Sequence, residues 1–93
     1  MNNHTIETVS ALKTILRHGP YAWPGGYPIY FITRDGEALS FDAVRENLQE
    51  VVGSIRHKLN DGWRVVAWDI NYENRDLICA HTHESIECAY PED

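Results

Sequence analysis

The chain has 93 residues, enough for one small domain with a single hydrophobic core. Apolar residues make up 43% and charged residues 24% of it, which is typical of a globular domain and excludes a disordered segment. With 8 basic and 14 acidic residues the formal charge is -6, which disfavours general electrostatic binding to nucleic acid or to an anionic membrane surface.

The first third of the chain predicts a helix, an aromatic loop and a strand. Apolar residues recur at helical spacing over residues 5–18. We expect Thr5 to cap this helix and Gly19-Pro20 to end it. Residues 21–28 are rich in Pro, Gly and aromatic side chains, which is typical of a loop, and residues 29–33 have the composition of a strand.

The middle of the chain predicts a hairpin turn and a long second helix. Asp35-Gly36 is typical of a tight turn, and we expect a short return strand over residues 37–39. Ser40 is the expected N-cap of the helix, whose apolar stripe runs from Phe41 to Leu59. We expect Gly62 to be the left-handed residue that follows it.

The last third of the chain predicts two further strands, over residues 63–72 and residues 77–81, antiparallel to each other across a short turn. Residues 86–90 add either a short strand or a helical turn. Residues 1–93 are therefore predicted to form a single α+β domain. In this fold a small antiparallel sheet, made of the hairpin and the C-terminal strands, packs against one long amphipathic helix, with an N-terminal helix beside it.

The acidic charge is concentrated at the end of the chain. Residues 1–68 carry seven acidic and seven basic side chains, whereas residues 69–93 carry seven acidic side chains and Arg75 alone. Two interpretations remain open: a face that binds a basic partner surface, or a solvated surface that keeps the protein soluble. The acidic candidates for partner binding are Asp69, Glu73, Asp76, Glu84, Glu87, Glu92 and Asp93.

Aromatic side chains are a second set of candidates for partner binding. Tyr21, Trp23 and Tyr27 lie in the loop rich in Pro and Gly, where stiff aromatic side chains bind a partner with little loss of rotamer entropy. In the other interpretation the same side chains cover the end of the hydrophobic core.

The C-terminal segment also contains residue types that bind zinc. Cys79, His81 and His83 alternate with a spacing of two, so they would share one face of a strand that continues to His83, and Cys88 would be a fourth ligand. This spacing matches no standard zinc motif, so we expect a buried cysteine beside exposed histidines, with no metal cofactor. The two cysteines are expected to be reduced rather than joined in a disulfide.

Neither export nor catalysis is indicated. The N-terminal residues lack the pattern of a signal peptide and no apolar run is long enough to span a membrane, so we expect a cytoplasmic protein. No Ser-His-Asp or Cys-His arrangement is evident along the chain, so we expect that it is not an enzyme.

Three segments together resemble a family of small uncharacterised proteins of proteobacterial mobile elements (plasmids and phages). The segments are WPGGYPIYFITRDGEALSFDAVREN, NDGWRVVAWDINYE and DLICAHTHESIECAYPED, and the similarity covers about residues 20–93. The family carries two Cys-x-x-Cys pairs, which suit a tetrahedral zinc knuckle. This chain has Ser40 and Ala43, then Cys79 and Thr82, at those positions. The resemblance therefore implies a degenerate knuckle that keeps Cys79 alone.

The resemblance implies a genomic setting rather than an activity. Small acidic proteins of mobile elements recur as inhibitors of host defence, and some occupy the nucleic-acid-binding channel of a restriction or CRISPR complex. We therefore expect a non-enzymatic inhibitor of the anti-CRISPR or anti-restriction type, whose acidic end blocks a basic surface of a host protein or ribonucleoprotein. The alternative is a structural or regulatory adaptor, a degenerate zinc knuckle that binds a protein through the aromatic loop. Neither function involves direct binding to nucleic acid or membrane.

Overall fold

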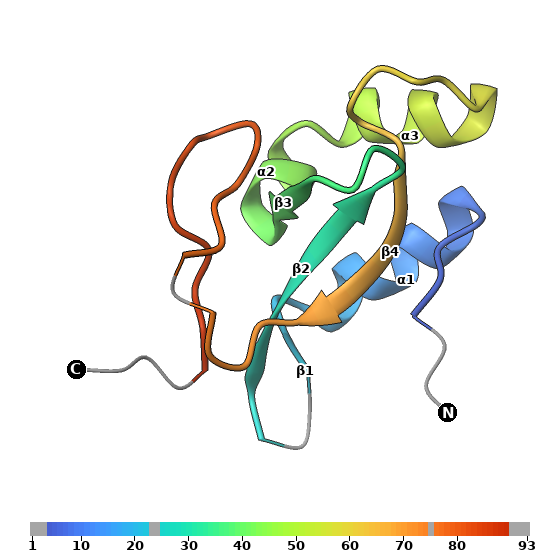
Figure 1. The fold of residues 1–93 in the computed structure, drawn as a ribbon. Helices are drawn as coiled ribbons and strands as arrows, with labels where there is room; N and C mark the ends of the chain where they lie inside the picture. The colour runs from blue at the N-terminus through green and yellow to red at the C-terminus, as the bar shows by residue number, and fades with distance from the viewer. Residues whose placement is uncertain (1–3, 23–24, 75, 90–93) are drawn as a thin grey trace.

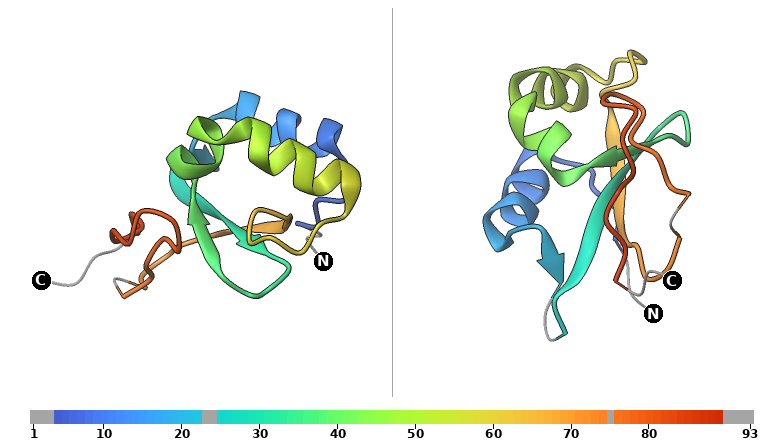
Figure 2. Two further views of the ribbon diagram at one scale, coloured as in Figure 1. Left: turned by 90° about the horizontal axis from the view of Figure 1, so that it is seen from above. Right: turned by 90° about the vertical axis from the view of Figure 1, so that its left-hand side faces the viewer.

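The computed structural model describes residues 4–22, 25–74 and 76–89, which form an α+β fold (Figure 1). The helices are α1 (Val9–His18), α2 (Phe41–Glu46) and α3 (Leu48–His57). The strands are β1 (Tyr21–Ala22), β2 (Tyr27–Thr33), β3 (Ala38–Ser40) and β4 (Val65–Ile70). The helices cover one face of the sheet, as Figure 2 shows, so the predicted fold class is confirmed. Among the described residues, no helix has both the length and the apolar character needed to cross a bilayer.

Strand β2 is the centre of an antiparallel sheet. It pairs with β1 at Tyr27 and Pro28, with β3 over residues 30–32, and with β4 over residues 29–33. Segments outside the strands cover the outer edges. The N–H of Ile6 donates to the carbonyl of Val66 on β4 at 2.8 Å. The N–H of Ala80 donates to the carbonyl of Ala38 on β3, also at 2.8 Å. Covered edges protect a small sheet from pairing with another chain.

The hydrophobic core lies between this sheet and the helices. The ring of Phe31, which is fully buried at the centre of β2, stacks on Phe41 of α2 with 6.1 Å between ring centroids. Each fully buried side chain of this size stabilises the fold by roughly 1.5–3 kcal/mol. The buried apolar residues are Ile6, Leu12, Ile29, Phe31, Leu39, Phe41, Ala43, Val44, Val51, Ile55, Val65, Cys79 and Ile86.

The first helix begins later than predicted. The hydroxyl of Thr8, not of Thr5, accepts the capping hydrogen bond, from the N–H of Ala11 at 3.1 Å. Thr5 forms a β-bridge with Ala67, because residues 4–6 are used to cover the edge of β4. Gly19 follows the helix as predicted, with a φ of 92° that favours glycine.

The predicted long helix over residues 41–59 is wrong in detail, because the structure has two helices in its place. Ser40 caps α2 as predicted, accepting from the N–H of Ala43 at 3.1 Å. The break lies at Asn47, whose side-chain amide donates to the carbonyl of Ala43 at 2.9 Å. The backbone N–H of Asn47 donates to the same carbonyl at 3.1 Å, and its backbone angles, φ -115° and ψ 36°, leave the helical range. Lys58 is the left-handed residue that ends α3, earlier than predicted, and Gly62 has the predicted positive φ, 83°, four residues later. Leu59 is exposed.

The predicted strand over residues 77–81 is also wrong. Residues 71–74 and 76–89 form an irregular C-terminal segment that runs past α2 and β3 (Figure 1), and a bridge joins Ile78 to Ser85 within it. The buried side chain of Asn71 holds the segment in place. Its amide donates to the carbonyls of Asn74 at 3.1 Å and Glu87 at 3.0 Å. The chain therefore leaves the sheet at Asn71, and β4 pairs with β2 instead of with residues 77–81.

Candidate functional site

A groove of about 370 Å³ lies between α2, the β1–β2 hairpin and the C-terminal segment. Tyr21, Pro28 and Phe41 supply much of its apolar wall. Four carboxylates also line it, two from α2 and two from the C-terminal segment. They are Asp42, Glu46, Glu84 and Glu87. We call this site the acidic groove.

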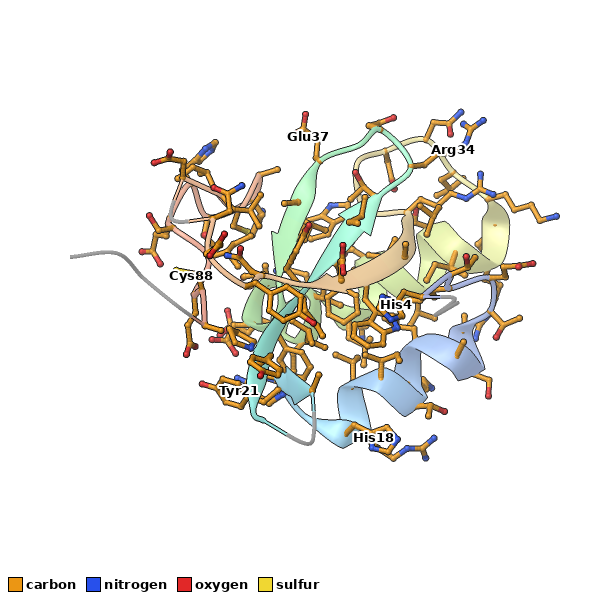
Figure 3. The ribbon with its side chains drawn as sticks, turned by 60° about the horizontal axis from the view of Figure 1, so that its bottom comes forward. His4, His18, Tyr21, Arg34, Glu37 and Cys88 are labelled. Carbon is orange, nitrogen blue, oxygen red and sulfur yellow. The ribbon has the colours of Figure 1, made fainter. Side chains whose placement is uncertain are left out.

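Tyr21 links the two sides of the acidic groove. Its hydroxyl donates to the carboxylate of Glu87 at 3.0 Å. This hydrogen bond and the negative charge of Glu87 raise the pKa of Tyr21 above its ordinary value, and burial and Asp42 raise it further. The two carboxylates therefore disfavour ionisation of this phenol. Figure 3 shows Tyr21 on the side of the molecule where Cys88 lies, away from Arg34.

The negative charge of the groove is compensated only in part. Nη2 of Arg45 lies 2.8 Å from the carboxylate of Asp42, and the same guanidinium lies over the ring of Phe41, 5.8 Å from its centroid. Within the described ranges, Glu46, Glu84 and Glu87 form no ion pair. Because like charges held close together repel one another, this arrangement favours a cationic group from outside the chain.

The other acidic candidates lie away from the groove. Asp69 is on β4, on the other side of β2, and its carboxylate is 3.8 Å from Nδ1 of His4. Burial raises the pKa of Tyr30, and the charge of Asp69 raises it further. Glu73 and Asp76 are exposed near the start of the C-terminal segment. Glu92 and Asp93 lie outside the described residues. The predicted antiparallel pair of residues 63–72 and 77–81 would have placed Asp69 and Glu73 near Asp76 and Glu84, but that pair does not form.

The aromatic candidates are divided between two places. Tyr21 lines the acidic groove, whereas the ring of Tyr27 lies against Tyr72, with 5.3 Å between their centroids. A Cβ atom at Gly25 would come within 2.5 Å of the Tyr27 ring, so that glycine permits the loop to pack on itself. Trp23 lies outside the described residues. The structure therefore does not bring Tyr21 and Tyr27 together as one aromatic surface.

The candidate zinc ligands do not form a site. Cys79 is buried, His81 packs on Trp63 with 4.8 Å between ring centroids, and His83 lies exposed in a turn with a positive φ of 62°. In the part of the chain that the structure describes, no group of three or more His, Cys, Asp or Glu residues could hold a metal ion. The predicted alternation required a strand through His83, and that strand does not form.

Cys79 instead lies in a turn that directs hydrogen-bond donors at its sulfur. The N–H of Ser40 donates to Sγ at 3.4 Å. Burial raises the pKa of the Cys79 thiol, but hydrogen bonds from the side chain of Thr82 and the backbone of Ser40, Thr82 and His81 outweigh burial and lower the pKa to about 7. Ser40 and Cys79, two positions that the resemblance assigns to a knuckle, therefore lie in contact.

Two residues of the acidic groove were missed by the sequence analysis. Asp42 and Glu46 belong to the half of the chain whose charges balance, and Asp42 has Arg45 three residues later, a spacing typical of a solvated helix face. A signal was nevertheless present, because Asp42 and Glu46 are four residues apart, a spacing that places them on one face of the helix that Ser40 caps. Comparison of the chain with protein-family models, curated proteins and solved structures finds no match.

Proposed function

We propose that the protein is a non-enzymatic binding protein whose acidic groove docks on a basic surface of a partner protein. The observation that carries this proposal is the convergence of Asp42, Glu46, Glu84 and Glu87 around one groove. Three of these carboxylates have no ion-pair partner within the described chain. Complementary charge on a partner would relieve their repulsion and increase the rate of association.

The partner proposed is a nucleic-acid-binding surface of a host defence complex in the cytoplasm. Such surfaces present clustered Lys and Arg side chains for phosphate contacts, which are the groups that the acidic groove would attract. The resemblance to proteins of mobile elements supports this setting. An occupied surface cannot bind nucleic acid, so the protein would act as an inhibitor.

Charge reversal at the acidic groove tests this function. Partners captured from bacterial lysate on the immobilised protein should be released by salt and by duplex DNA. The variant Glu46→Lys/Glu84→Lys should lose about tenfold or more in affinity for them, since two attractive contacts become repulsive. The control Glu73→Lys/Asp76→Lys makes the same change of charge outside the groove and should lose less than about twofold. Equal losses in the two variants, or binding that neither salt nor DNA weakens, would contradict the proposal.

A further inference from the structure

A second groove, of about 370 Å³, lies between α1 and α3. Its lining residues are Lys13, Leu48, Gln49, Val52, Gly53 and Arg56. All but Lys13 belong to α3, where their spacing places them on one continuous face. Leu48 and Val52 are half-buried and form an apolar floor, whereas Lys13 and Arg56 are exposed. Figure 2 shows α1 and α3 side by side in the layer that covers the sheet. We call this site the helix groove.

Gly53 is the most informative residue of the helix groove. Glycine in the interior of a helix is destabilising relative to alanine, so its presence within α3 needs a reason. A Cβ atom at Gly53 would meet no atom within 4 Å, so packing of the described chain does not require a glycine here. Its backbone does not have the positive φ that would require one either. The open space above Gly53 therefore suits the close approach of another molecule.

The rim of the helix groove carries the opposite charge to the acidic groove. Neither Lys13 nor Arg56 forms an ion pair with any residue in the described part of the chain. A nucleic-acid backbone would pair with these cations but would leave Leu48 and Val52 exposed. A partner that satisfies both features has an apolar ridge flanked by carboxylates. An amphipathic helix presents such a ridge at positions i, i+3, i+4 and i+7, and it packs into the groove between two helices.

We propose that the helix groove binds an acidic amphipathic helix of a partner protein, with an apolar side chain seated over Gly53 and carboxylates beside Lys13 and Arg56. The proposal is independent of the proposed function, because it involves other helices and the opposite charge. The protein would then have two binding grooves, the acidic groove for a basic surface and the helix groove for an acidic helix.

Selection from a phage-displayed library of short helical peptides tests the proposal on the full chain. Enriched sequences should combine apolar residues at helical spacing with flanking Glu or Asp. The best peptide, followed by fluorescence anisotropy, should bind Gly53→Leu at least about tenfold more weakly than the unsubstituted protein, because the leucine fills the hollow. The variants Lys13→Gln and Arg56→Gln should each lose about threefold, whereas the control Arg17→Gln, on α1 but outside the groove, should lose none.

Gly53→Ala separates binding from folding. Alanine should raise Tm by about 3–6 °C, since it favours the helix, and should still weaken the peptide by about threefold. Enrichment of basic peptides, no enrichment, or unchanged binding by a folded Gly53→Leu variant would overturn the proposal. Sedimentation of the protein without peptide tests another occupant. A dimer that Gly53→Leu converts to a monomer would assign the groove to a second copy of the chain and overturn the acidic-helix assignment.

Discussion

The helix-and-sheet body and the C-terminal segment are held in place by different kinds of interaction. Residues 4–22 and 25–70 form helices and strands around Phe31 and most of the buried apolar side chains. The C-terminal segment, residues 71–74 and 76–89, contributes two buried apolar residues, Cys79 and Ile86, and depends on hydrogen bonds from Asn71. The acidic groove takes carboxylates from both regions. We therefore expect that releasing the segment would disrupt the acidic groove while the body stays folded.

The largest expected effect comes from the core of the body. Phe31→Ala removes a fully buried ring that stacks on Phe41, and it should lower the free energy of unfolding by about 3–5 kcal/mol. Urea denaturation followed by tryptophan fluorescence measures this loss. We expect all parts of the protein, including the C-terminal segment, to lose amide protection together. A loss below about 1 kcal/mol would contradict the central position of β2 in the core.

A smaller and more local effect is expected at Asn71. Asn71→Ala leaves the buried carbonyl of Ile86 and the part-buried carbonyls of Asn74 and Glu87 without this donor, and it should destabilise the C-terminal segment by roughly 1–3 kcal/mol. Hydrogen exchange should show protection lost over residues 77–89 and kept in β2 and β4. The neighbouring exposed residue supplies a control, since Glu73→Gln should change protection in neither region. Equal loss of protection in body and segment would show that the two regions unfold as one unit.

We expect the thiol of Cys79, in the C-terminal segment, to make the stability of the protein depend on pH. Because hydrogen bonds outweigh burial and lower the pKa of Cys79 to about 7, from an ordinary value of 9.0, the folded protein keeps the thiolate over a range where the unfolded chain holds a proton. This stabilisation is complete above pH 9 and is lost as the pH falls through 7. Stability should therefore rise by about 1–2 kcal/mol from pH 7 to pH 9. Urea denaturation across this pH range measures the rise, which should be absent in Cys79→Ala and kept in Cys88→Ser. An equal rise in Cys79→Ala and in the unsubstituted protein would contradict the prediction.

Local patterns in the sequence determined much of the body. Ser40 caps α2 and Gly19 follows α1 as predicted, because capping depends on residues within one helical turn. The hairpin at Asp35-Gly36 was also predicted from adjacent residues, and the N–H of Gly36 donates to the carbonyl of Thr33 at 2.9 Å. The helix break at Asn47 was missed because apolar spacing continues across it. The break is a change of backbone angles at Asn47, to φ -115° and ψ 36°, which the pattern of hydrophobicity does not register.

The α+β class and the concentration of acidic charge near the chain end follow from the amino-acid sequence. Which carboxylates meet depends on how the elements pack. Glu84 and Glu87 lie beside Asp42 and Glu46, more than 35 residues earlier in the chain, while Asp69 lies across β2. The physical reason is that periodicity and capping act over a few residues, whereas the position of the C-terminal segment depends on Asn71 and on the contact of Ser40 with Cys79. Those contacts join residues that no local pattern connects.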